Sequence, residues 1–123
     1  MSKVIHFELS VDDPQKAAAF YGNVFGWKVM PAYGDDYIMV HGDSNEPGID
    51  GAIMRRRQPG LSTVNVISVA NYDAALEAIK SNGGTVVSDR MDIENVGIAA
   101  YCLDPEGNTF GILEPAFGNQ PQA

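Results

Sequence analysis

The chain has 123 residues, of which 45% are hydrophobic and 20% charged, a balance typical of one soluble globular domain and not of a disordered chain. Its formal net charge of −8 makes nucleic acid and anionic membrane surfaces poor partners. The single cysteine excludes an internal disulfide and a multi-cysteine zinc site. We expect a cytoplasmic protein, because the lone cysteine suits a reducing compartment and no stretch approaches the roughly 20 apolar residues of a membrane span.

The first predicted element is a strand over residues 4–10 with two chemically different faces. Apolar and polar residues alternate along it, and successive side chains of a strand point to opposite faces. The polar face carries His6, Glu8 and Ser10. Two ionisable residues on one face of a strand make this face the first candidate for a functional site.

A helix and three more strands complete the first half. Asp13 followed by Pro14 predicts a helix start, since aspartate caps free N–H groups and proline is tolerated in the first turn. Gly26 predicts the helix end, because glycine readily takes the left-handed cap conformation. The following strands are predicted at residues 27–30, 37–41 and 52–55.

The second half repeats the order strand, helix and three strands. It predicts a strand at 63–69, a helix at 72–82, and strands at 85–87, 97–103 and 109–113. Asp104 to Asn108 reads as a tight turn, in which proline presets φ and glycine is free to take a positive φ. A shift of 58 residues superposes the halves, placing Ala17 on Ala75 and Gly26 on Gly84. We interpret one domain, 1–123, built by duplication: module one is 1–57, the linker 58–62, module two 63–115 and the tail 116–123.

Three sequence segments resemble motifs of the vicinal oxygen chelate superfamily, which includes glyoxalase I, bleomycin-resistance proteins and extradiol dioxygenases. They are VIHFEL from residue 4, AFYGNVFGW from residue 19 and DPEGNTFGILEP from residue 104. The resemblance implies an α+β fold of two tandem βαβββ modules, whose curved mixed sheets form a cup-shaped barrel. It also implies a frequent homodimer and a site for a small organic molecule on the inner wall of the cup.

Metal enzymes of this superfamily take ligands, usually His or Gln plus Glu, from the first and last strands of each module. His6 matches the first of these positions, and the 58-residue shift places Val64 at its equivalent. The last-strand positions fall at Gly111 and near Gly51, next to Asp50. Because valine and glycine side chains offer no metal ligand, we expect no standard metal site and no cofactor.

His6 and Glu8 leave two chemical interpretations open. Two apart on one strand, they project from the same face about 7 Å apart at the backbone. They could act as a general acid–base pair, or bind a metal in a nonstandard way with Asp50 and water. They could equally hydrogen-bond to each other or to Ser10 and line a polar wall without chemistry.

Aromatic residues supply the remaining candidates. Tyr37, Tyr101 and Phe110 could line a ligand surface, as pockets often are, and ordinary core packing would explain them equally well.

Our first hypothesis is therefore a metal-free small-molecule-binding protein whose ligand meets His6 and Glu8. The alternative is a lyase, isomerase or dioxygenase that uses His6 and Glu8, with or without a divalent metal. A third hypothesis is a small regulatory or interaction domain with no small ligand.

Overall fold

A computed structural model describes residues 2–31 and 34–116. Residues 117–123, most of the predicted tail, lie outside this description. The chain divides into two compact units: a first unit, Ile5–Val64, and a second unit of Met1–Val4 with Asn65–Ala123. The division falls just after the predicted linker 58–62.

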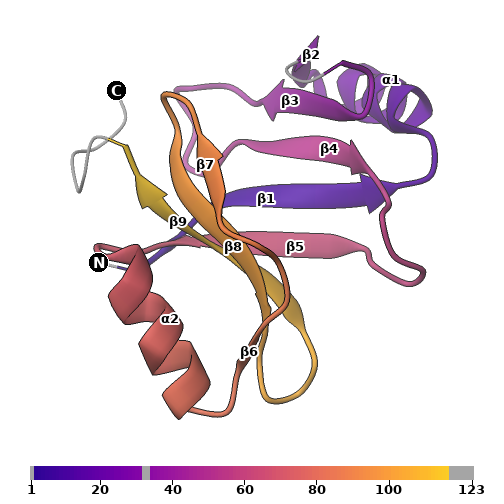
Figure 1. The fold of residues 1–123 in the computed structure, drawn as a ribbon. Helices are drawn as coiled ribbons and strands as arrows, with labels where there is room; N and C mark the ends of the chain where they lie inside the picture. Colours follow the sequence, from indigo (N-terminus) through magenta and orange to yellow (C-terminus); the bar gives the residue numbers. More distant parts are fainter. Residues whose placement is uncertain (1, 32–33, 117–123) are drawn as a thin grey trace. The chain divides into compact units, whose positions relative to one another are not determined.

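The described residues of the first unit form four strands and one helix (Figure 1). They are β1 (Val4–Val11), α1 (Pro14–Phe25), β2 (Lys28–Pro31), β3 (Tyr37–His41) and β4 (Gly51–Arg55). β4 pairs in parallel with β1 and antiparallel with β3, and β2 lies antiparallel to β3 on the far side. The predicted βαβββ order is confirmed, and no strand end differs from its prediction by more than one residue.

The ends of α1 are fixed by the residues that the sequence indicated. The Asp13 carboxylate accepts a hydrogen bond from the Lys16 backbone N–H at 3.1 Å, and Pro14 stands in the first turn. Gly26 ends the helix with φ 74°, and its N–H bonds to the Gly22 carbonyl. Because glycine has no Cβ, this left-handed conformation costs little there.

The second unit contains β5 (Thr63–Ser68), α2 (Tyr72–Ser81), β6 (Thr85–Val86), β7 (Met91–Ile93), β8 (Gly97–Leu103) and β9 (Thr109–Pro115). β5 and β9 pair in parallel, as β1 and β4 do, and β8 lies antiparallel to β9. Asn71 caps α2 as Asp13 caps α1, by accepting a hydrogen bond from the Ala74 N–H. The internal duplication is therefore visible in topology as well as in sequence.

One strand of the second unit was not predicted. β7 has only three residues and pairs antiparallel with the first half of β8, while β6 pairs with its second half. Together, β6 and β7 accompany β8 as the single strand β2 accompanies β3. A three-residue segment bounded by charged residues carries too little alternation to be recognised, since its stability comes from pairing with β8.

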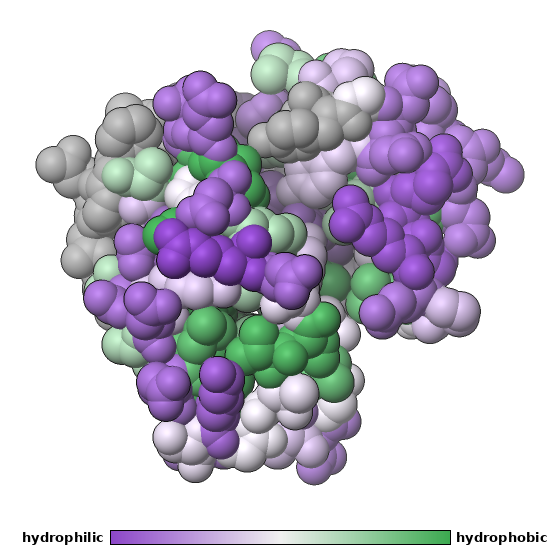
Figure 2. Space-filling model, in the orientation of Figure 1, coloured by the Kyte–Doolittle hydropathy of each residue, from purple (hydrophilic) through white to green (hydrophobic). Residues whose placement is uncertain are grey.

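Each helix covers one face of its own sheet. Ala18, Ile38, Val40 and Ile53 form the buried core under α1, and Val69, Tyr72, Ala100 and Ile112 form the core under α2. Figure 2 shows hydrophobic side chains of the second unit gathered over the region of α2 and β6, whereas the surface on the right of the view is mostly hydrophilic. In each unit, the sheet face away from the helix is left to carry other side chains.

Candidate functional site

The face of the first sheet opposite α1 carries the predicted site residues. Phe7, Leu9 and Val11 of β1 pack with the α1 core, so the alternating side chains of β1 project to the other face. Ile38 and Val40 of β3 and Ile53 of β4 also belong to this core. The residues that share the opposite face are His6, Glu8, Ser10, Tyr37, Met39, His41, Ala52 and Met54.

Tyr37 joins His6 to Glu8 across this face. Its hydroxyl donates a hydrogen bond to Glu8 Oε2 at 2.7 Å and lies 3.0 Å from His6 Nε2. His6 Nε2 and Glu8 Oε2 are themselves 4.0 Å apart. The sequence left open a direct hydrogen bond between His6 and Glu8, but Tyr37 lies between them. Three of the predicted ligand residues are thus brought together.

The network assigns the proton positions on His6. A tyrosine hydroxyl carries one proton, and here Glu8 accepts it. The contact between His6 Nε2 and Tyr37 Oη is then favourable when Nε2 carries a proton and donates it. In the neutral imidazole this leaves Nδ1 as the basic atom.

His6 is largely shielded from water, with 21% of its side chain exposed. Burial lowers the pKa of His6 below its ordinary value of 6.5, and the negative charges of Glu8 and Asp50 oppose this only in part. Glu8 is only 5% exposed as a residue. The site therefore pairs a neutral imidazole with a buried carboxyl group.

A second histidine lies at the end of the same face. His41 Nδ1 is 3.1 Å from Asp50 Oδ2, and the other Asp50 oxygen accepts the Gly42 backbone N–H. Desolvation acts to raise the pKa of Asp50, but these hydrogen bonds outweigh it and lower the pKa. Asp50 is engaged with His41 and the loop backbone in this arrangement. It makes no hydrogen bond with His6 within the described residues.

The family's metal-ligand positions can now be located by strand register. β1 pairs Glu8 with Ala52, and β5 pairs Val66, the equivalent of Glu8, with Gly111. The counterpart of Gly111 in the first unit is therefore Ala52, one residue beyond the Gly51 that the sequence alignment gave. Val64 and Ala52 are 1% and 0% exposed and carry no donor atom. The residues present do not fit the standard divalent-metal set, and among residues 2–31 and 34–116 no three His, Cys, Asp or Glu side chains are grouped to hold a metal.

The other two aromatic candidates lie in the second unit and on different faces of its sheet. Tyr101 pairs with Gly111, and its ring would lie 3.7 Å from a Cβ placed there. Phe110, the neighbour of Gly111 along β9, packs instead with the core under α2. Of the two interpretations open for Phe110, the structure places it among core residues.

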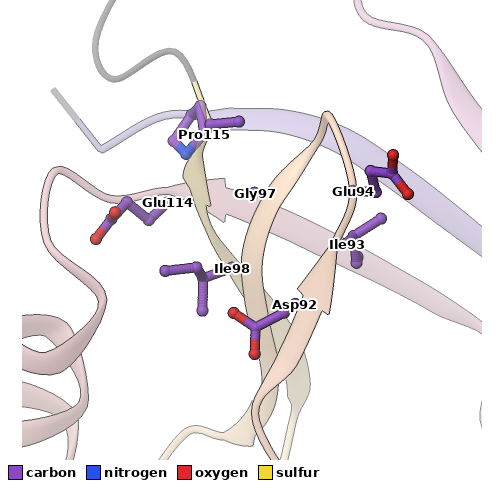
Figure 3. A pocket seen from close by; sticks show the side chains of 8 residues that line it. Asp92, Ile93, Glu94, Gly97, Ile98, Glu114 and Pro115 are labelled. Atoms are coloured by element: carbon purple, nitrogen blue, oxygen red, sulfur yellow. The ribbon is translucent and has the colours of Figure 1, made fainter.

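Two shallow hollows lie away from the His6–Tyr37–Glu8 network: one of about 480 Å³ beside Arg56 and Pro59 in the first unit, and one of about 470 Å³ in the second unit. The hollow in the second unit is lined by Asp92, Ile93, Glu94, Gly97, Ile98, Glu114, Pro115 and Ala116. Figure 3 shows Glu114 and Glu94 directed to opposite sides, so their carboxylates do not converge. Asp92 is paired with Arg90, and Glu114 accepts the Tyr72 backbone N–H at 2.7 Å. These acids serve local structure.

Sequence reasoning did not find the bridging role of Tyr37 or the pair of His41 and Asp50. Tyr37 was singled out only as an aromatic side chain. Its position on β3, two strands away from β1 across β4, is what brings its hydroxyl to Glu8. The sequence does contain a pattern that indicates a second polar strand face: Tyr37 and His41 alternate with apolar residues along one strand, as His6 and Glu8 do along another.

Comparison with known proteins places the chain in a family. The model of the Glyoxalase/Bleomycin resistance protein/Dioxygenase superfamily matches residues 3–112. A protein of Mycobacterium tuberculosis named "Putative glyoxylase CFP32" is 34% identical over 115 residues, which cover 89% of this chain. The chain spans 42% of the length of that mycobacterial protein.

Two further proteins are similar over nearly their whole length. The lactoylglutathione lyase of Salmonella typhimurium is 27% identical, covering 91% of this chain and 92% of its own. The crystal structure of methylmalonyl-CoA epimerase from Mycobacterium tuberculosis has a TM-score of 0.68 with 14% identity, covering 91% of this chain and 87% of the other. At that identity the structural likeness shows the fold alone. In the described part of the chain, neither helix is long and apolar enough to cross a membrane.

Proposed function

Because the chain belongs to the glyoxalase/bleomycin resistance protein/dioxygenase superfamily, we propose that it binds a small organic molecule at the face where Tyr37 joins His6 and Glu8. The proposed site does not use the family's standard divalent-metal set. The observation that carries the proposal is the hydrogen-bonded network of imidazole, phenol and carboxyl groups on one sheet face. A network of this kind supplies both donors and acceptors that orient a polar ligand.

The identity of the surrounding residues supports the metal-free form of the proposal. Val64, Ala52 and Gly111 occupy three of the four family ligand positions without a donor atom. His6 is the one matching residue, and its Nε2 is directed to Tyr37. With Nε2 held by the Tyr37 hydroxyl, Nδ1 is the nitrogen of the neutral ring that can accept a hydrogen bond or a proton.

A thermal-shift screen of small organic compounds tests the binding function. Compounds that bind the folded protein raise its melting temperature, and the rise grows with ligand concentration. We expect compounds that stabilise the wild type and the Tyr21→Phe variant but not the Tyr37→Phe variant. The Tyr21 hydroxyl makes no hydrogen bond within the described residues, so it is a matched control. Stabilisation that is identical in all three proteins would place the ligand elsewhere and contradict the proposal.

A second candidate is a lyase or isomerase that works by proton transfer, and the state of His6 favours it. Burial keeps the imidazole neutral, so Nδ1 is able to accept a proton from a substrate. The resulting imidazolium would be stabilised by Glu8, whose Oε2 lies 4.0 Å from Nε2. Nε2 keeps its proton in the bond to Tyr37 throughout.

The names of two similar proteins supply the substrates for testing this candidate. Lactoylglutathione would be assayed for breakdown, and methylmalonyl-CoA for deuterium uptake from heavy water. Activity present in the wild type and in His41→Ala, but lost in His6→Ala, would support acid–base catalysis by His6. Equal loss in both variants would point to a structural effect. No turnover of either substrate would leave binding as the better supported function.

A further inference from the structure

Several large apolar side chains of α1 are exposed to solvent. Phe20, Val24 and Phe25 are 56%, 56% and 62% exposed, and Val29 of β2, which packs beside α1, is 43% exposed. Val29 pairs with the core residue Val40 of β3, so its side chain lies on the α1 side of the sheet. Phe20, Val24, Phe25 and Val29 are called the α1 patch. Exposed apolar patches rimmed by polar residues mark interaction surfaces of soluble proteins.

The helix α2 of the second unit provides an internal comparison. The shift of 58 residues that superposes the modules places Ala78 at the position of Phe20 and Asn82 at that of Val24. All of α2 is described by the structure, and none of its large hydrophobic side chains is exposed. The packing of a helix on a sheet of this fold therefore does not need large apolar residues at these positions. Their presence on α1 points to a further contact.

The exposed rings of the α1 patch are held in place by other aromatic residues. The ring of Phe20 meets that of Tyr21 edge-on, with centroids 5.1 Å apart, and Phe25 stacks on the other side of Tyr21 at 6.2 Å. Tyr21 in turn stacks on Trp27 at 4.9 Å. Because these rings are already ordered, a partner that covers them costs little additional side-chain entropy. Rigid aromatic side chains are the usual energetic centres of protein interfaces.

The charges of the chain indicate which partner fits the patch. Each chain carries a formal net charge of −8, so two copies repel each other over most of their surfaces. α1 carries Lys16 and no acidic residue, whereas α2 carries Asp73 and Glu77. Pairing through α1 therefore brings no carboxylate of this helix against another. A single lysine also gives no row of charge that would select an unlike, highly charged partner.

The area of the patch is close to what self-association needs. A phenylalanine buries on the order of 200 Å², so four side chains that are about half exposed offer roughly 400 Å² per copy. A specific interface buries about 600 Å² or more on each partner. Lys16, Ala19 and Asn23 border the patch on α1 and are exposed, so they extend the contact toward that area.

We propose that the α1 patch is the interface between two copies of the chain, with α1 of one copy packed antiparallel against α1 of the other. A two-fold axis between the helices places Phe20 of each copy near Val24 of the partner subunit. In such an interface the same residues face each other from both sides, so every contact is made twice. The patch contains the apolar residues for this contact and lacks the carboxylates that would oppose it.

Sedimentation velocity of the whole chain tests the proposal at about 1–100 μM, the range in which an interface of modest area associates. The wild type should pass reversibly from monomer to dimer. Phe20→Glu puts a carboxylate into the apolar contact twice, so the dissociation constant should rise about tenfold or more. Val24→Glu makes the same test without changing the ring contact between Phe20 and Tyr21. Ala78→Glu adds the same charge at the equivalent exposed position of α2, and this control should associate as the wild type does.

Trp27 gives a second measurement of the same contact. It is the single tryptophan of the chain, and its ring centroid lies 6.1 Å from that of Phe25. Quenching of its fluorescence by acrylamide should weaken as the wild type associates. In Val24→Glu the quenching should not depend on protein concentration, and circular dichroism would check that the variant is folded.

Three results would overturn the inference. The first is a wild type that stays monomeric over this range. The second is a dimer that both Phe20→Glu and Val24→Glu leave unchanged, because its interface would then lie elsewhere. The third is equal weakening in Ala78→Glu, which would show an effect of net charge. The α1 patch lies on the opposite side of the first sheet from the His6–Tyr37–Glu8 network, so none of these results bears on the proposed binding function.

Discussion

Replacing Tyr37 by phenylalanine removes one hydroxyl and with it the hydrogen bonds to Glu8 and His6. Glu8 Oε2 loses a donor at 2.7 Å, and His6 Nε2 loses its acceptor at 3.0 Å. A hydrogen bond to a charged group is worth about 1.5–3 kcal/mol, and one between neutral groups about 1 kcal/mol. Because Glu8 is buried, water replaces the lost donor poorly. We therefore expect the free energy of unfolding to fall by about 2–3 kcal/mol.

Urea denaturation followed by circular dichroism measures this loss. With a denaturant dependence of about 1–3 kcal/mol per molar urea, the midpoint should fall by roughly 1 M or more. The Tyr21→Phe variant controls for the loss of a phenolic oxygen, because Tyr21 packs by stacking on Trp27 at 4.9 Å and its hydroxyl is unbonded within the described residues. If Tyr37→Phe is as stable as Tyr21→Phe, the network does not exist in solution as described.

Three further changes have defined outcomes. Burial lowers the pKa of His6 in the folded state, so the unfolded state takes up the proton first as the pH falls. The free energy of unfolding therefore keeps its full value above about pH 6.5 and declines as the pH falls through the folded pKa. The His6→Gln variant should lack this part of the decline in urea midpoint. If the urea midpoints of the wild type and of His6→Gln fell by the same amount across the acid range, the role of His6 would be contradicted. Gly51→Ala would place a Cβ 2.5 Å from the Phe7 carbonyl oxygen, so β1 and β4 would have to separate, and we expect a loss of about 3 kcal/mol in urea denaturation. Gly107→Ala puts a side chain at φ +85° with open space around it, so the loss should be only about 1 kcal/mol from backbone strain; a larger loss than in Gly51→Ala would refute the steric argument.

The fold was accessible from the sequence because its signals are local. Strand alternation, an aspartate cap and glycine helix ends each depend on residues near one another in the chain. The turn at Asp104 is an example: its carboxylate accepts the backbone N–H groups of Glu106 and Asn108, and Gly107 has the positive φ that the sequence predicted. The family assignment is also confirmed, because the family model matches residues 3–112 and so covers both modules.

The site was only partly accessible, because its contacts join distant residues. The shared face of His6 and Glu8 follows from their spacing, but the bridge by Tyr37 depends on the register of β1, β4 and β3. The same register decides that Ala52 is the counterpart of Gly111, and that Phe110 faces the α2 core. A shift of one residue in a strand moves every side chain to the other face, so sequence alignment alone could not fix these positions. The homodimer stays a prediction, which sedimentation velocity would check.

The metal content of the purified protein tests the central claim most directly. The chain would be produced without an affinity tag, dialysed, and analysed for zinc, manganese, iron, nickel and magnesium, with thermal stability measured in each metal. We predict no metal at stoichiometric amounts and no metal-dependent rise in melting temperature, because Val64, Ala52 and Gly111 supply no ligand. One metal ion per chain that survives dialysis, and is lost in His6→Ala, would contradict the metal-free site.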